Sequence, residues 1–279
     1  MKYLLKLIFS IRESRVGMIG LAICLFWVLV AIFADVLAPF DPLAIVAPMA
    51  SPGFSSEQGI LWLGGDFLGR DIMSRIIHGA RTVLLWAPVA TACAYAIGIM
   101  LGLTAGYYGG FVDEILSFFA NMVLAFPVLV LLILIISILG ASPLSIVVAV
   151  TFASSPAVFR LVRGEVLSIR SRDFIAAAKT RGENIFYILF IEILPNAKGP
   201  LIVDACLRMG YTTIFIGILG FLGLGFPPPT PDWGGMINEN RAIALVAPHM
   251  TIFPCLAVSS LVLGLNLLAD GISEVSKKI

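Results

Sequence analysis

The sequence predicts an all-α membrane protein with about six transmembrane helices in a single domain. Of its 279 residues, 59% are hydrophobic and only 13% are charged, and the mean hydropathy is +1.03. Soluble domains have roughly 45–50% apolar and about 25% charged residues, and a soluble fold of this size could not bury so much apolar surface. Five stretches without Asp, Glu, Lys or Arg reach the roughly 20 residues that a bilayer span needs. They are Val16–Ala34, Thr82–Val112, Ile115–Phe159, Met209–Pro231 and Ala242–Ala269.

The stretch Ile115–Phe159 holds 45 residues, which is too long for one span. The turn-forming cluster at residues 140–143, Gly-Ala-Ser-Pro, divides it into two helices and brings the expected total to six. Membrane barrels show alternating segments of about ten residues, whereas these runs are continuously apolar.

The first span follows a basic N-terminal segment, as a signal peptide would. Its apolar run is longer than the roughly 7–15 residues of a signal-peptide core, and no clear small-residue cleavage site follows it closely. We therefore expect the segment to be retained. Residues 1–15 are predicted to form a cytoplasmic interfacial segment, and residues 16–279 the single transmembrane domain.

The distribution of Lys and Arg predicts that both termini are cytoplasmic. Thirteen of these residues lie in the N-terminus, residues 160–199 and the C-terminus, against four on the opposite side. Cytoplasmic loops carry the excess of Lys and Arg in membrane proteins. Because the net charge is only +1 and no basic stripe is interleaved with aromatics, we expect no nucleic-acid partner. The four scattered cysteines predict free thiols packed among the helices.

An outer loop of residues 39–81 follows the first span. Near its end, Ile72, Met73, Ile76 and Ile77 recur at helical spacing. We expect a short amphipathic helix along the membrane surface, serving either as a packing collar over the bundle or as a docking surface for an external partner. The candidate residues of this loop are Gly64, Asp66, Gly69, Arg70, Asp71, Ser74, Arg75, Gly79 and Arg81.

The cytoplasmic loop of residues 160–199 is the longest on the basic side. Its alanine run predicts a helix that ends at Gly182, and a second, apolar helix should end before Pro195. Such a projecting unit is either a linker at the membrane surface or a docking element for a soluble partner. The candidate residues are Arg172, Asp173, Ala176, Ala177, Ala178, Lys179, Arg181, Gly182, Glu183 and Pro195.

A third loop, residues 226–248, opens with four prolines in five positions, which hold the chain extended. Trp233 suits a membrane interface. We interpret this loop as a rigid structural element. Its candidate residues are Pro228, Pro231, Trp233 and Gly234.

Charged residues within the spans are few. Asp204 and Arg208 lie one helical turn apart, near the cytoplasmic end of the fifth span, in the order that favours a mutually neutralising pair. An ion-coupled secondary transporter usually needs ionisable groups near the midplane or broken helices. Prolines at positions 88, 127 and 254 can kink spans, but no carboxylate or histidine expected to be buried accompanies them. The two histidines, His78 and His249, form no metal-ligand or catalytic grouping that predicts an intramembrane enzyme.

The three loops together resemble the inner-membrane permeases of the dipeptide/oligopeptide/nickel family of ABC importers. The family's outer signature, L-G-T-D-x-x-G-R-D-x-x-S-R-x-x-x-G-A-R, is matched from Leu63 to Arg81, with Gly65 where Thr is usual. Its cytoplasmic signature, E-A-A-x-x-x-G with Pro thirteen residues after the Gly, is matched by the residues up to Pro195, with Ala176 in place of the Glu. Residues 220–234, 253–254 and 266–271 are also similar. The resemblance covers residues 15–275, and the single span before the outer loop resembles the C-type permease of the pair.

The resemblance implies a type I ABC importer permease fold and a non-catalytic transmembrane subunit in the bacterial inner (cytoplasmic) membrane. The implied partners are a homologous sister permease, two ATPase subunits, an external substrate-binding protein and the bilayer. The sequence contains no G-x-x-x-x-G-K-[ST] phosphate loop, so ATP and Mg²⁺ are expected on partner subunits and no cofactor or metal on this chain. The helix around Asp173–Asn184 would sit in a groove on one ATPase, whose closure would rock the bundle between outward and inward access.

The substrate is open at this point. Di- or oligopeptides are the favoured interpretation, while nickel, another metal–chelator complex and small glycosides fit the same architecture. An ion-coupled secondary transporter and a scaffold subunit without transport are the alternatives of another class.

Overall fold

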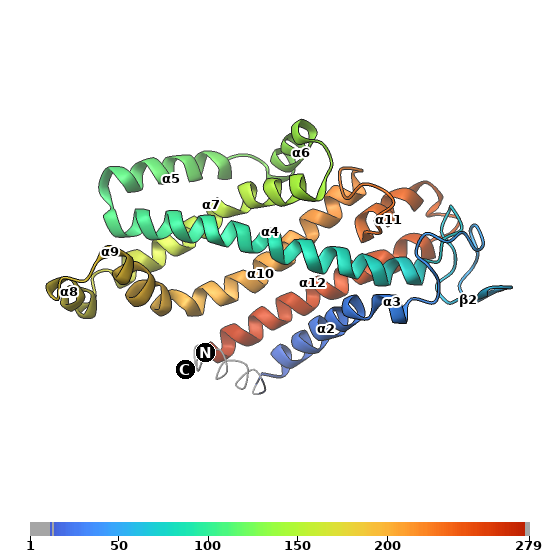
Figure 1. Ribbon diagram of the computed structural model, residues 1–279, viewed down its shortest axis with the longest axis horizontal. Coiled ribbons are helices and arrows are strands. Elements are labelled where there is room, and N and C mark those ends of the chain that lie inside the picture. Colours follow the sequence, from blue (N-terminus) through green and yellow to red (C-terminus); the bar gives the residue numbers. More distant parts are fainter. Residues whose placement is uncertain (1–11, 13, 277–279) are drawn as a thin grey trace.

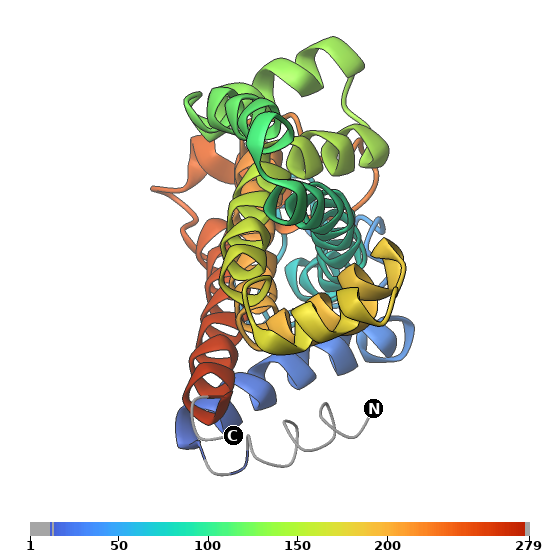
Figure 2. The ribbon, with the colours of Figure 1, turned by 90° about the vertical axis from the view of Figure 1, so that its left-hand side faces the viewer.

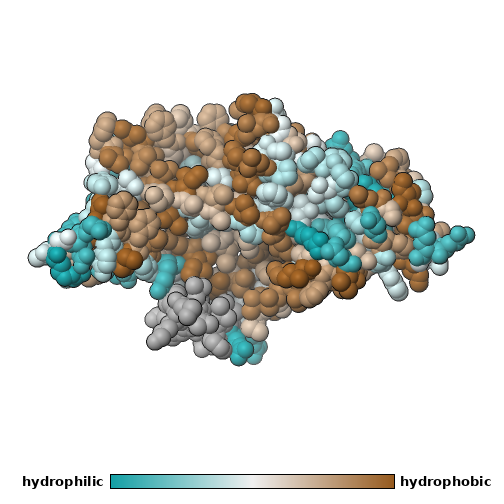
Figure 3. Space-filling view, viewed as in Figure 1, coloured by the Kyte–Doolittle hydropathy of each residue, from teal (hydrophilic) through white to brown (hydrophobic). Residues whose placement is uncertain are grey.

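The computed structural model describes residue 12 and residues 14–276, which form an elongated bundle of helices (Figure 1, Figure 2). Its long helices are α2 (Arg15–Ile32), α4 (Ile72–Tyr108), α7 (Pro143–Ile169), α10 (Leu194–Phe221) and α12 (His249–Ser276). Each is long and apolar enough to cross a membrane, with α10 continued by residues 185–193 ahead of it. Hydrophobic side chains cover the middle of the molecule, and hydrophilic ones gather towards its two ends (Figure 3). The all-α membrane fold is confirmed, while the predicted interfacial segment lies largely outside the described residues.

The remaining span is a bent pair of helices. α5 (Gly110–Leu124) and α6 (Val128–Leu139) meet at 90°. The sequence predicted one helix for residues 115–139 and a possible kink at Pro127, and the structure shows two helices with a sharp break at that proline. Pro127 precedes α6, and proline disfavours the helical conformation of the residue before it, so α5 ends there. The predicted division at residues 140–143 is confirmed, because Ser142 caps α7 by accepting from the Ser145 amide at 3.1 Å.

The predicted surface helix before the second span is wrong. Residues 72–81 are the first turns of α4, a single helix of 37 residues. Asp71 caps this helix by accepting from the Ser74 amide at 2.7 Å, and α4 continues past Thr82 without a break. Its apolar side, including Ile72 and Ile76, is buried in a core cluster with Trp27, so it packs on the bundle rather than on lipid.

Glycines allow α4 and α7 to pack closely. Gly98, Gly102 and Gly106 recur every fourth residue along α4, opposite a row of valines on α7. A Cβ atom on Gly102 would lie only 2.7 Å from Cβ of Val162. The helices approach this closely because small residues bring the two backbones together, as is common between membrane helices.

The cytoplasmic segment contains α8 (Asp173–Thr180), α9 (Ile185–Tyr187) and the π-helix η2 (Ile188–Ile193), which runs directly into α10. The predicted helix end before Pro195 is wrong. In η2 the Leu194 amide reaches back five residues to the Leu189 carbonyl. A proline has no N–H and its ring clashes with the preceding turn of an α-helix, and the wider π turn relieves both conflicts. The continuous helix makes the non-helical part of this loop shorter than residues 160–199.

The outer end carries shorter elements: α3 (Ala34–Leu37), the hairpin strands β1 (Phe54–Ser56) and β2 (Gly59–Leu61), α11 (Trp233–Asn240) and the 3-10 turn η3 (Arg241–Ile243). Trp233 is fully buried rather than at a membrane interface, which corrects that prediction. Its Nε1 donates to the Ile76 carbonyl at 3.0 Å, and its ring meets Trp27 edge-on with centroids 4.9 Å apart. The indole therefore ties α11 to α4 and α2 inside the core.

Candidate functional sites

The helix α8 projects from one end of the bundle (Figure 1) and presents most of the predicted coupling residues to solvent. Its buried side consists of Ile175 and Ala178, both fully inaccessible and packed in a cluster with Ile169. Because these residues anchor one side, the other side is left free to meet a partner. The predicted residues that lie exposed on and around α8 are Arg172, Asp173, Ala176, Ala177, Lys179, Arg181 and Gly182.

Local backbone rules define the ends of α8. Asp173 in its first turn and Lys179 in its last complement the helix dipole. Gly182 follows with φ of +76°, a left-handed conformation that suits glycine at a helix end, so the predicted stop is confirmed. Glu183 is half-buried and lies 3.5 Å from Arg181. Pro195 stands apart from this surface, in the first turn of α10.

Two aromatic residues that the sequence reasoning did not single out complete this surface. Phe186 and Tyr187 in α9 are 69% and 36% exposed, at an end of the molecule that is otherwise polar. Contiguous exposed apolar surface rimmed by polar residues is typical of a protein or membrane contact. The pattern that reveals it is an aromatic pair within the basic loop, directly after the glycine stop.

The projecting segment that contains α8 contacts the C-terminal end of α4 through two basic side chains. The Nη1 atom of Arg170 donates to the Gly106 carbonyl at 2.8 Å, satisfying one of the free carbonyls at the C-terminus of that helix. The ammonium of Lys179 lies over the Tyr107 ring, 5.0 Å from its centroid. Arg163 of α7 forms a two-pronged ion pair with Asp113 of α5. A displacement of α8 is therefore felt by α4, α5 and α7 together.

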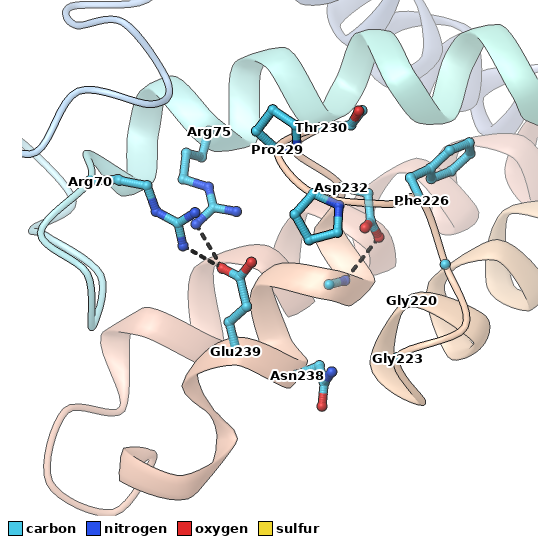
Figure 4. A pocket seen from close by; sticks show the side chains of 13 residues that line it. Arg70, Arg75, Gly220, Gly223, Phe226, Pro229, Thr230, Asp232, Asn238 and Glu239 are labelled. Atoms are coloured by element: carbon cyan, nitrogen blue, oxygen red, sulfur yellow. Dashed lines mark hydrogen bonds and ion pairs between the residues drawn. The ribbon is translucent and has the colours of Figure 1, made fainter. Parts of the chain in front are cut away.

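The outer signature builds an internal ion-pair network, which we call the outer network: Asp66, Arg70, Arg75 and Glu239 (Figure 4 shows the two arginines and Glu239). Arg75 Nη1 lies 2.5 Å from Asp66 and 2.8 Å from Glu239. Arg70 reaches the same two carboxylates at 2.7 and 2.5 Å. Arg75 and Asp66 are almost wholly buried, so these residues join the first outer loop to α11 and do not form an exposed docking patch.

The glycines of the signature are packed inside the loop, whereas Arg81 lies exposed at its edge. Gly64 has φ of +87°, and a Cβ there would lie 2.5 Å from the Ala50 carbonyl. Gly79 lies against the Trp233 ring, where a Cβ would be 2.8 Å from Cδ1. Arg81 pairs with Asp35 at 2.9 Å and so ties α4 to α3. The remaining member, Gly69, adopts a left-handed conformation in the same loop.

A small polar cavity of about 190 Å³ opens beside the outer network (Figure 4). The proline segment, including Pro228, and Asp232 line it. Asp232 caps α11 by accepting from the Gly235 amide at 2.9 Å, and burial raises its pKa to about 6 against the lowering effect of these backbone hydrogen bonds. Pro231 accepts from the Thr82 hydroxyl at 2.9 Å. A Cβ on Gly234 would lie 2.1 Å from the Gly217 carbonyl, so α11 packs directly on the α10 backbone.

A third polar group lies inside the bundle. Asp204 and Arg208 of α10 form the expected ion pair, with Arg208 Nε 2.6 Å from the carboxylate, and Tyr95 of α4 donates a hydrogen bond to the same carboxylate. The pair sits near the middle of α10, because this helix begins at Leu194, well before the apolar run that starts at Met209. Sequence reasoning did not identify Tyr95, whose contact is 109 residues away along the chain.

Two family models and several known proteins match the sequence of this chain. A family model described as binding-protein-dependent transport system inner membrane component matches residues 98–278, and one described as N-terminal TM domain of oligopeptide transport permease C matches residues 8–58. The chain is 38% identical over 265 residues to the dipeptide transport system permease protein DppC of Alkalihalophilus pseudofirmus, covering 95% of this chain and 86% of that protein. It is 43% identical over 213 residues to the glutathione transport system permease protein GsiD of Pectobacterium atrosepticum, covering 76% and 71%.

The fold is similar to that of a solved transporter. The inward facing MetNI methionine ABC transporter aligns with a TM-score of 0.59 at 18% sequence identity, covering 74% of this chain and 97% of that chain. The fold and these matches define a multi-pass membrane permease. The chain belongs to the family of binding-protein-dependent transport system inner membrane components, and within it is a C-type permease subunit of an ABC importer.

Proposed function

We propose that this chain forms half of the pathway through which an ATP-driven importer moves di- or oligopeptides across the bacterial inner membrane. The chain itself binds no nucleotide and catalyses no reaction. ATP and Mg²⁺ bind to two partner ATPases, a homologous permease supplies the other half of the pathway, and an external binding protein delivers the substrate. Relatives named for dipeptide and glutathione transport support the substrate class.

One observation carries the proposal: α8 and α9 form an anchored unit with a free face at the basic end of the molecule. Ile175 and Ala178 fix α8 on the bundle, while Ala177 and Phe186 are exposed for a partner to cover. Exposed apolar surface of this kind marks a contact site, and a soluble ATPase is the partner that an importer requires. The excess of Lys and Arg around this segment supports a cytoplasmic position for it and for both termini.

The proposed coupling follows from the contacts of this unit. Because α8 is joined through Arg170 and Lys179 to the end of α4, and through η2 to α10, two states of the ATPase can favour two arrangements of the bundle. A partner shifts such an equilibrium only through unequal binding to the two arrangements.

Purification and uptake test the function together. The C-terminally tagged chain is purified from its native membranes in mild detergent, and two ATPase subunits and a second permease are expected at comparable stoichiometry. Cells lacking this chain should lose uptake of a labelled dipeptide and regain it on complementation. Gly182→Pro combined with charge reversal at Lys179 and Arg181 should abolish uptake and release the ATPases, whereas charge reversal at the distant Arg241 should leave both intact.

Three results would each contradict a part of the proposal. Transport that persists in the altered α8 variant would refute the coupling assignment. A chain that purifies alone under several gentle detergents, with no partner ATPase, would refute the importer role and favour an ion-coupled carrier. Uptake of a metal–chelator complex in place of a dipeptide would overturn the substrate class alone.

A further inference from the structure

The ion pair of Asp204 and Arg208 lies within α10, inside the candidate membrane span that runs from Ile185 to Phe221. Arg208 stands fourteen residues from the start of α10 at Leu194 and thirteen from its end at Phe221. At about 1.5 Å per residue, this places it roughly 20 Å from either end of the helix. Charged side chains at such a depth are costly and usually mark a substrate or ion pathway. Since apolar residues of similar volume often stabilise an interior as well as a buried ion pair does, stability alone does not account for this one.

Hydrogen bonds hold the ion pair of Asp204 and Arg208 in place, but they do not use all the donors of the guanidinium. Asp204 receives hydrogen bonds from Tyr95, from Nε of Arg208 at 2.6 Å and from Nη2 of Arg208 at 3.2 Å. Arg208 uses Nε and Nη2 for the Asp204 carboxylate, and its side chain also interacts with Tyr95, which leaves part of its five N–H donors unused. The Arg208 side chain is 19% exposed, so it retains access to a ligand. The carboxylate therefore positions a guanidinium that keeps donor capacity for a further anionic group.

Arg208 lines a cavity of about 180 Å³ between the α5–α6 bend, α7 and α10. Its walls are mainly apolar and include Phe126, Val128 and Phe215, while Ser154 and Tyr211 add hydroxyl groups. Complete ligand sites measure roughly 300–1,000 Å³, so this cavity has room for one part of a ligand, such as a single side chain.

The break in the third span opens onto the same cavity. Leu124, Phe126 and Val128 flank the break and line the cavity wall. The fifteen residues of α5 put this break about 22 Å from the basic end, at a depth similar to that of Arg208. Non-helical backbone at membrane depth is tolerated where it is buried in protein or lines a water-filled cavity. The break therefore lies where the backbone lines a cavity inside the bundle.

We propose that this cavity is a substrate-contact site in the translocation pathway, in which Arg208 binds the terminal carboxylate of a passing peptide and the apolar walls receive the side chain of its last residue. The inference rests on the proposed peptide substrate. Charge complementarity assigns the carboxylate to the Arg208 guanidinium, and the apolar walls beside it favour an apolar final residue over a polar one. Tyr95 and Asp204 act as positioning residues.

The test uses the complete importer, reconstituted in proteoliposomes with its sister permease, ATPases and binding protein. Uptake of labelled Ala-Phe and Ala-Gly is measured together with ATP hydrolysis stimulated by the loaded binding protein. Arg208→Gln should lower Ala-Phe uptake about tenfold, the effect of losing one charge-assisted hydrogen bond, while stimulated ATP hydrolysis persists. Arg208→Lys keeps the positive charge and should restore part of the Ala-Phe uptake that Arg208→Gln loses. Ser154→Leu fills the cavity and should lower Ala-Phe uptake several-fold more than Ala-Gly uptake.

A matched control removes another arginine from the bundle. Arg160 on α7 donates to Asn121 at 2.7 Å and does not line the cavity, so Arg160→Gln should leave the preference between the two peptides unchanged. If Arg208→Gln does not accumulate in the membrane, the peptide preference of Ser154→Leu decides the question.

Distinct outcomes would overturn the inference. Wild-type uptake by Arg208→Gln, or equal loss of both peptides in Ser154→Leu, refutes the contact site. Loss of the sister permease from Arg208→Gln during purification would show instead that the pair is an assembly contact. An assembled wild-type importer that hydrolyses ATP but takes up neither peptide refutes the proposed substrate class before any variant is compared.

Discussion

The glycine row on α4 predicts a large effect from a single methyl group. In Gly102→Ala, the new Cβ would lie 2.7 Å from Cβ of Val162 and 2.9 Å from the Phe159 carbonyl. Optimal carbon–carbon contacts are about 3.5–4.0 Å, so α4 and α7 would have to separate locally by about 1 Å. Overpacking of this kind costs about 1–3 kcal/mol. We expect the apparent melting temperature in detergent to fall by about 2–4 °C for each kcal/mol, measured at a fixed scan rate.

Gly164 on α7 provides the matched control. A Cβ there meets nothing within 4 Å, and alanine is the better helix former by roughly 0.8–1 kcal/mol, so Gly164→Ala should be neutral or stabilising. The two substitutions make the same chemical change in the same helix pair and differ in the space available. A Gly102→Ala protein that melts with or above the wild type would refute the close approach of these helices.

Three further predictions address the ends of the molecule. Arg75→Met leaves the buried Asp66 with fewer partners and should destabilise the protein by about 3 kcal/mol, whereas adding Asp66→Asn should recover part of that loss in the same melting assay. Burial raises the pKa of Asp232 to about 6, so the folded protein favours the protonated carboxyl group. The contribution of Asp232 to the stability of the fold therefore falls as the pH rises from about 4 to above 6. Asp232→Asn keeps the helix cap and should make the melting temperature less dependent on pH in this range. Gly182→Ala places a side chain at φ of +76°, a cost of about 1–2 kcal/mol confined to the tip, so uptake should fall more clearly than the melting temperature.

The membrane spans could be predicted from the sequence because each depends only on residues close together in the chain. A run of apolar residues long enough to cross a bilayer predicts a helix whatever its neighbours are, and the turn cluster at residues 140–143 acts within the chain. The helix end at Gly182 was likewise predicted from adjacent residues. The ends of the helices were harder to predict, because α4 and α10 extend past their charge-free runs into polar segments.

The sites depended on contacts between distant parts of the chain. Glu239 joins Arg75 across 164 residues, and nothing near either residue indicates this pairing. Trp233 has the composition of an interfacial residue, and only the approach of α4, which offers the Ile76 carbonyl, explains its burial. The passage of the helix through Pro195 depends on a π turn, which no residue pattern in the loop predicted.

The continuity of that helix has a mechanical consequence. From Ile185 to Phe221 the chain is helical over 37 residues without a break, with α8 preceding its inner end and the Gly217–Gly234 contact fastening its outer part to α11. Because this helix is held near both ends, a displacement of its inner end is passed along the backbone to its outer end. In the proposed importer, we therefore expect a displacement of the cytoplasmic tip and a change at the outer loop to occur together rather than in separate steps.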